Sequence, residues 1–182
     1  MPTPRSLNTV EFGWNGTDGW VIEKLSGEIG VETVADNDVL ISNSTPEYWG
    51  LHKVISEIDL KNLLHVPVNL EGTFADMAGG YNLCLLAYNG ATEWDNTQAI
   101  ITNFANDNPI YADNWTEVQT AFIPEGGTSA SLTFNLTNTY KNLAVMLRPA
   151  AAESPQTARI QSIKFGTVDP ITTFEIITTP FA

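Results

Sequence analysis

Between residues 114 and 166 the sequence consists of short runs of alternating apolar and polar residues, separated by turn-forming residues. In the run SLTFNLT, Leu132, Phe134 and Leu136 fall on one face of an extended chain, and the residues between them fall on the other. A period of two is typical of strands with one buried face. This segment therefore predicts β-structure, and it constrains the fold more strongly than it constrains the function.

Similar runs recur along the chain, about ten in all at spacings of about 8–12 residues, and none has a helical stripe. They predict an all-β fold, a two-sheet antiparallel jelly-roll β-sandwich. We expect three parts: an N-terminal arm at 1–9, the sandwich at 10–166, and a C-terminal arm or extra edge strand at 167–182. The polar stretch 91–113 is predicted to be a long irregular connection between strands.

The composition excludes several classes of partner. The chain has 8 Lys and Arg residues against 21 Asp and Glu residues, a net charge of −13. This charge repels phosphate backbones and anionic lipids, so we expect neither nucleic acid nor membrane as a partner. The N-terminal residues lack the apolar core of a signal peptide, so we expect synthesis in the cytosol without a conventional export signal.

Motifs of catalysis and metal binding are also absent from the sequence. His52 and His65 stand in separate runs without zinc-ligand spacing, and no serine lies in a GxSxG turn. Cys84 is the single cysteine, within the apolar run YNLCLLAY, and is interpreted as a small buried hydrophobe. We therefore predict that the protein is not an enzyme and has no catalytic residues.

Three segments carry a resemblance to a known family: EFGWNGTDGWVIE, NWTEVQTAFIPEGG and ARIQSIKFG. In this order they resemble the opening, a tryptophan-led strand and the closing strand of carbohydrate-binding-module-like (galactose-binding-like) jelly rolls. The matching positions are Glu11, Asp18, Gly19, Trp20, Trp115, Phe122 and Pro124. The resemblance covers most of residues 10–166.

The resemblance implies a structural calcium ion, because the last strand of this family often carries a ligating aspartate. Here the matching position is Gln161, and Glu11 is the other candidate ligand. An amide oxygen brings no charge to a Ca²⁺ ion, so we expect no cofactor.

Aromatic residues provide the candidates for glycan binding, because exposed rings stack on sugar rings. Those in loop-like contexts or near them are Tyr48, Trp49, Tyr88, Trp94 and Tyr111. The alternative for each is a role in packing or at a subunit interface.

The leading functional hypothesis is a phage capsid decoration (cement) protein, because a single jelly roll with extended arms and no export signal suits a virion protein. It would assemble in the host cytoplasm as a homotrimer and bind the major capsid protein or another virion protein at the virion surface. Its assembly arm would be the C-terminal segment, with Phe174, Ile176, Ile177 and Phe181. The alternatives are a glycan-binding module or adhesin, and a host cytoplasmic accessory protein.

Overall fold

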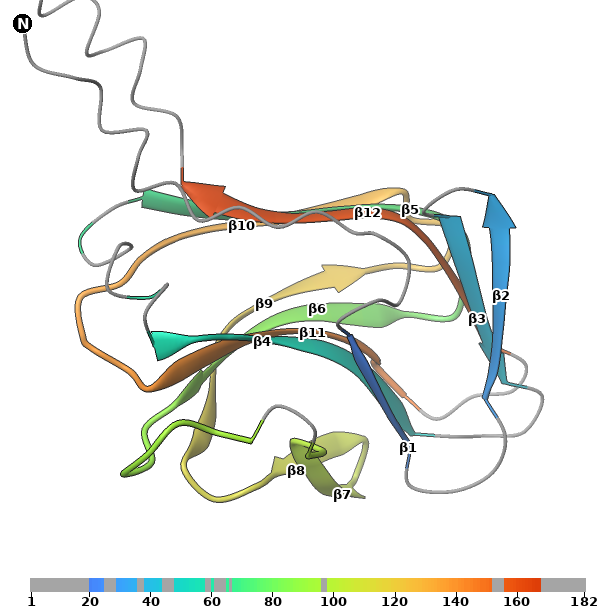
Figure 1. The fold of residues 1–182 in the computed structure, drawn as a ribbon. Helices are drawn as coiled ribbons and strands as arrows, with labels where there is room; N and C mark the ends of the chain where they lie inside the picture. Colours follow the sequence, from blue (N-terminus) through green and yellow to red (C-terminus); the bar gives the residue numbers. More distant parts are fainter. Residues whose placement is uncertain are drawn as a thin grey trace, which may run out of the picture.

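A computed structural model describes residues 20–24, 29–35, 38–43, 48–57, 60, 65, 67–95, 98–151 and 156–167. Two five-stranded sheets pack face to face, and a two-stranded hairpin lies beneath one of them (Figure 1). Every strand pairing is antiparallel, which confirms the prediction of an antiparallel two-sheet sandwich. Among the described residues, no helix is long and apolar enough to cross a membrane.

The first sheet, called the β6 sheet, has the order β1 (Val21–Lys24), β4 (Trp49–Ile55), β11 (Asn142–Pro149), β6 (Tyr81–Tyr88) and β9 (Trp115–Ile123). The second, called the β5 sheet, has the order β10 (Ser129–Asn135), β5 (Pro67–Ala78), β12 (Gln156–Thr167), β3 (Asp38–Asn43) and β2 (Gly30–Ala35). The hairpin consists of β7 (Ile101–Ala105) and β8 (Asn108–Tyr111).

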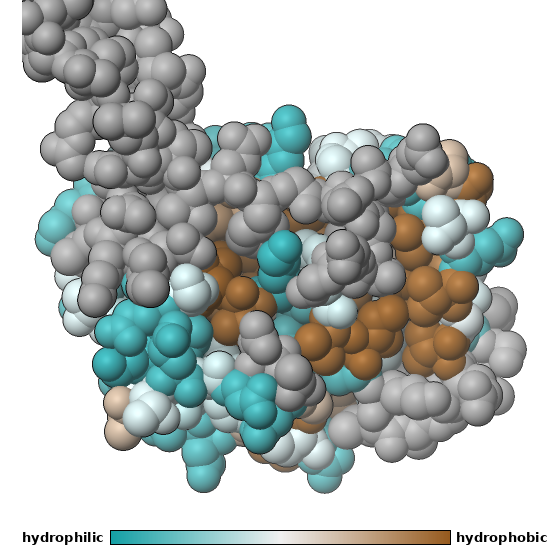
Figure 2. Space-filling view, viewed as in Figure 1, coloured by the Kyte–Doolittle hydropathy of each residue, from teal (hydrophilic) through white to brown (hydrophobic). Residues whose placement is uncertain are grey.

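The main core fills the space between the two sheets. Leu132, Phe134 and Leu136 lie in it, as their period of two predicts, while Thr133 and Asn135 are exposed. From the facing sheet, β6 contributes Tyr81, Leu83, Leu85 and Ala87 to this core. Figure 2 shows apolar residues gathered along the band between the sheets and hydrophilic residues mainly around its outside.

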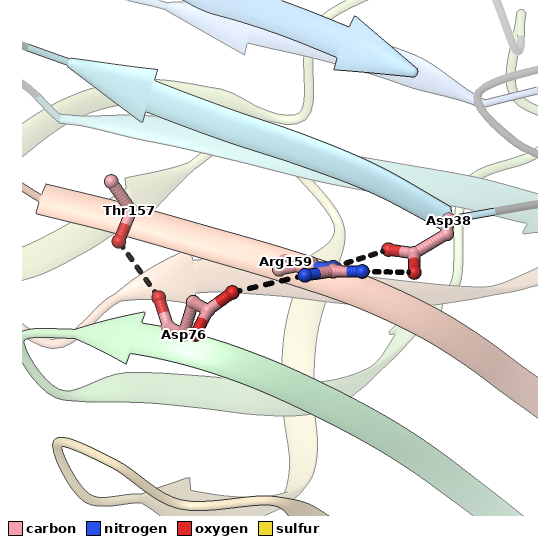
Figure 3. Close-up of polar contacts among 4 residues, drawn as sticks. All are labelled: Asp38, Asp76, Thr157 and Arg159. Atoms are coloured by element: carbon pink, nitrogen blue, oxygen red, sulfur yellow. Dashed lines mark hydrogen bonds and ion pairs between the residues drawn. The ribbon is translucent and has the colours of Figure 1, made fainter. Parts of the chain in front are cut away.

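An ion-pair network joins three strands on the outer face of the β5 sheet (Figure 3). Arg159 of β12 donates two hydrogen bonds to Asp38 of β3, each at 2.7 Å. Its Nη1 also donates to Asp76 of β5 at 3.1 Å. Hydrogen bonding to Arg159 lowers the pKa of the Asp38 carboxyl below its ordinary value.

The stretch 91–113, predicted as irregular, contains the β7–β8 hairpin, so that prediction was wrong. The tip residues Asn106 and Asp107 both have positive φ, the backbone conformation of the tight turns that connect hairpin strands. The predicted N-terminal arm at 1–9 and the C-terminal residues 168–182 lie outside the described residues.

The Asp38–Arg159 pair gives a testable dependence of stability on pH. Because the folded-state pKa of Asp38 is lowered, the ionised carboxylate contributes to folding stability above the unfolded-state pKa of about 3.9. That contribution is lost as pH falls through the folded-state pKa. We expect Asp38→Asn to lower Tm by a few degrees at neutral pH, and the gap to the wild type to close below about pH 4.

Thermal unfolding over a pH series checks this expectation. Asp76→Asn is the matched control, because the Asp76 side chain is 68% exposed and its ion pair should contribute less. A Tm difference between the wild type and Asp38→Asn that stays constant from neutral to acidic pH would contradict a stabilising role of the ionised Asp38 carboxylate.

Candidate functional site

The outer face of the β6 sheet, which points away from the β5 sheet, is apolar at its centre. Strands β6 and β11 place Cys84, Leu86, Ala144 and Met146 on this face, and all four are fully buried. An antiparallel sheet with one face in water normally alternates apolar and polar residues. Another part of the chain must therefore cover this face.

Residues 98–114, which we call the cover, lie against the outer face and include the β7–β8 hairpin (Figure 1). Ile100 and Ile101 are buried together with the four sheet residues in a second apolar cluster, separate from the main core. The removal of this apolar surface from water favours attachment of the cover to the sheet.

Glu23 of β1 fixes the cover at one edge of the sheet. Its Oε2 accepts a hydrogen bond from the Ile100 N–H at 2.7 Å, and its Oε1 accepts one from the Ile101 N–H at 2.9 Å. The Glu23 side chain is almost fully buried. Hydrogen bonds to a carboxylate are about twice as strong as those between neutral groups, so Glu23 is a firm anchor.

His52 of β4 lies fully buried beside this anchor. Its Nδ1 is 3.0 Å from Glu23 Oε2, although the two atoms are not aligned for a hydrogen bond. No cluster of three or more His, Cys, Asp or Glu side chains that could hold a metal occurs in the described part of the chain. His65, by contrast, is exposed.

The opposite edge of the sheet holds the other end of the cover. Tyr111 donates a hydrogen bond from its hydroxyl to Glu117 Oε2 at 2.9 Å, and Thr120 donates to Glu117 Oε1. Arg148 Nη2 lies 3.5 Å from Glu117 Oε2. Three donors on three strands thus converge on one carboxylate, which lies at the boundary between the covered face and water.

Burial shifts the titration of two groups near this boundary. It raises the pKa of the Tyr111 phenol well above its ordinary value, so the hydroxyl remains a donor at neutral pH. It also raises the pKa of the Cys84 thiol to about 11. Cys84 is therefore a poor nucleophile and a packing residue, in agreement with its interpretation from the sequence.

Beyond Glu117, strand β9 carries an uncovered strip of the outer face. Ala121 packs against the main core and Ile123 lies within it, so Thr120 and Phe122 point to the outer face. The Phe122 side chain is 61% exposed.

Asn82 of β6 pairs with Phe122 and is half-buried. We call the set of Asn82, Tyr111, Glu117, Thr120 and Phe122 the rim strip.

The five aromatic residues predicted to bind glycan do not form one surface. Trp49, assigned to a loop from its sequence, begins β4 and lies in the main core, so that placement was wrong. Its inward position leaves the ring no access to a ligand. Tyr88 and Trp94 pack around Trp115 at the second cluster, with ring centroids 5.0 to 5.7 Å apart.

Tyr48 lies elsewhere, at the hairpin. Its ring stacks on Phe104 with centroids 4.0 Å apart, and its hydroxyl bonds to Asp107 at the hairpin tip. Tyr111 is therefore the one residue of the predicted five that belongs to the rim strip.

Sequence reasoning missed Glu23, Glu117 and Arg148 as site residues. A signal for the cover was present, because YNLCLLAY and NLAVMLRP are apolar on both faces. No local signal indicates that Glu23 meets Ile100, since 77 residues separate them.

Of the two candidate calcium ligands that the family resemblance implies, the structure describes Gln161. Gln161 is exposed, and its side chain hydrogen-bonds to Asp38, whose charge Arg159 already neutralises. Ca²⁺ takes six to eight oxygen ligands. The Arg159 guanidinium pairs with Asp38 and Asp76 and opposes a second cation beside these two carboxylates. Glu11 lies outside the described residues.

No protein-family model matches this sequence, and no curated protein matches it. Among solved structures, the xylanase 10B CBM22-1–GH10 modules of Clostridium thermocellum are similar, with TM-score 0.51 and 10% identity over 85% of this chain and 27% of that chain. A CBM4 structure has TM-score 0.50 and 11% identity over 85% of this chain and 90% of that chain.

The enzymatically active domain of tailspike protein 4 from bacteriophage CBA120 has TM-score 0.48 and 8% identity, over 85% of this chain. This chain spans 20% of the tailspike chain and 27% of the xylanase chain. At these identities the likeness concerns the fold alone: the chain is an antiparallel jelly-roll β-sandwich like those of carbohydrate-binding modules.

Proposed function

We propose that this chain is a non-catalytic glycan-binding module that holds its ligand on the rim strip. The observation that carries the proposal is the exposed ring of Phe122 on the same strand and face as the hydrogen-bonded Glu117. A sugar ring has an apolar face of C–H groups and a rim of hydroxyls. An aromatic ring and oriented polar groups that follow one another along the same strand suit these two features in neighbouring sugar units.

Glu117 is the central polar group of this site. Tyr111, Thr120 and Arg148 hold its carboxylate in place, while its side chain remains about one third exposed. A sugar hydroxyl would meet an acceptor that is already oriented, which lowers the entropic cost of binding. Glycosidases ordinarily use a pair of carboxyl groups, and Glu117 is the only carboxylate of the rim strip. The geometry thus favours binding over hydrolysis.

The charge of the site favours an uncharged glycan. The positive charge of Arg148 at the rim strip is already paired with Glu117. The chain as a whole carries a net charge of −13. Uronates and sulfated sugars would meet repulsion from this field.

The comparisons support the glycan-binding alternative better than the capsid hypothesis. The xylanase CBM22-1–GH10 modules, of which 27% of the chain is similar to this fold, were solved in complex with xylohexaose. The capsid protein partner, the homotrimer and the virion surface stay predictions, because Phe174, Ile176, Ile177 and Phe181 lie outside the described residues.

Calorimetry with neutral oligosaccharides, chosen from a glycan array, tests the proposal. We expect Phe122→Ala to weaken binding by about tenfold, because it removes the stacking platform. Glu117→Gln should weaken binding by a similar factor, because the amide presents one acceptor oxygen where the carboxylate presents two.

Two exposed positions on the β5 sheet provide matched controls. Val31→Ala removes an exposed apolar side chain, and Glu71→Gln removes an exposed carboxylate. Both should bind like the wild type. Equal affinities for all four variants would show that the rim strip is not the binding site.

A further inference from the structure

The outer face of the β6 sheet is divided between the cover and the rim strip. The cover reaches from Glu23 on edge strand β1 to Glu117 on edge strand β9. Beneath it, the central residues of β6 and β11 are fully buried. A ligand therefore has access to the β9 edge of this face and not to its centre.

From this division we infer that the cover sets ligand size: the module binds a short stretch of glycan along β9 and excludes a chain laid across the sheet. The inference rests on the proposed function and adds a specificity determinant to it. A ligand crossing all five strands would run about 19 Å over the sheet, at about 4.8 Å per strand. The cover occupies that path.

The uncovered path is shorter and runs in another direction. From Glu117 to Phe122 the strand extends over at most about 17 Å, and the bulge in β9 shortens it. The half-buried Asn82 and Tyr111 border this path on its inner side. Such a strip has room for a short oligosaccharide, while further sugar units of a longer chain would extend into water.

The cover is held too firmly to be displaced by a weakly bound sugar. Both oxygens of Glu23 accept backbone hydrogen bonds in a buried setting, and Ile100 and Ile101 are buried below them. Further along the cover, the Ala112 N–H donates to the Ile100 carbonyl at 2.7 Å, and the Asn114 carbonyl accepts from the Asn89 N–H at 3.0 Å. The Ala112–Ile100 bond joins two parts of the cover to each other. Displacement of the cover would break its bonds to Glu23 and Asn89 together.

Affinity as a function of oligosaccharide length tests the inference on the wild-type chain. We expect affinity for a neutral homologous series to rise from the disaccharide to the trisaccharide and then to level off. A continued rise to the hexasaccharide would overturn the inference while leaving glycan binding intact. Absence of binding at every length would overturn the proposed function and this inference with it.

Glu23→Gln provides the second arm, because a glutamine amide can accept only one of the two backbone hydrogen bonds. Cys84 lies beneath the cover, so its alkylation by iodoacetamide in the folded protein reports opening. We expect labelling of the variant to be about tenfold faster than that of Cys84 in the wild type, and its affinity to keep rising beyond the trisaccharide.

Glu32→Gln, on the exposed strand β2, is the matched control and should label like the wild type. Where Glu23→Gln does not fold, Tyr48→Phe replaces it, because it removes the hydroxyl bond to Asp107 at the hairpin tip. A folded variant with faster Cys84 labelling and an unchanged length dependence would overturn the role of the cover. If Cys84 in Glu23→Gln and in Tyr48→Phe were alkylated at the wild-type rate, the anchoring role assigned to Glu23 and to the hairpin tip would be overturned.

Discussion

The structure depends on the burial of β6 and β11 on both faces. One face of these strands packs into the main core through residues such as Leu83 and Val145, and the other packs under the cover through Leu86 and Met146. Exposing either face would place large apolar side chains in water. The sandwich therefore needs a third layer over the outer face of the β6 sheet, and residues 98–114 supply it.

Buried charges locate that third layer, and each is compensated differently. Glu23 accepts hydrogen bonds from two backbone N–H groups of the cover, whereas Arg148 forms an ion pair with Glu117. A buried charge without a partner is costly, so the hydrogen bonds of the cover to Glu23, together with that of Tyr111 to Glu117, constrain where the hairpin can lie. The Asp38–Arg159 pair on the β5 sheet is partly exposed. It joins neighbouring strands of that sheet and attaches no further layer to it. The two sheets thus differ: one has an open polar outer face, and the other has a face that is covered except along β9.

The sequence predicted which strand residues are buried better than it predicted which aromatic residues are exposed to a ligand. Leu132 and Phe134 lie in the core because alternation reports directly on which face of a strand is apolar. The aromatic residues carry no such information, since Trp49 and Trp94 both stand beside polar residues and glycine or aspartate. Trp49 is a core residue because β4 begins there. Trp94 packs on the second cluster, where its backbone N–H donates a hydrogen bond to Asn142 Oδ1 on β11. Neither outcome follows from the neighbours of these residues in the sequence.

By itself the sequence determined the all-β class, the antiparallel sandwich and an acidic surface, because period-two patterning, turn residues and net charge are local or additive properties. Only the tertiary structure decided that residues 98–114 cover the outer face of one sheet and that β9 keeps an open strip. Those features arise where Glu23 meets Ile100 and where Arg148 meets Glu117. Contacts between residues so far apart in the chain depend on how the sheets are assembled, and alternation within a strand carries no record of them.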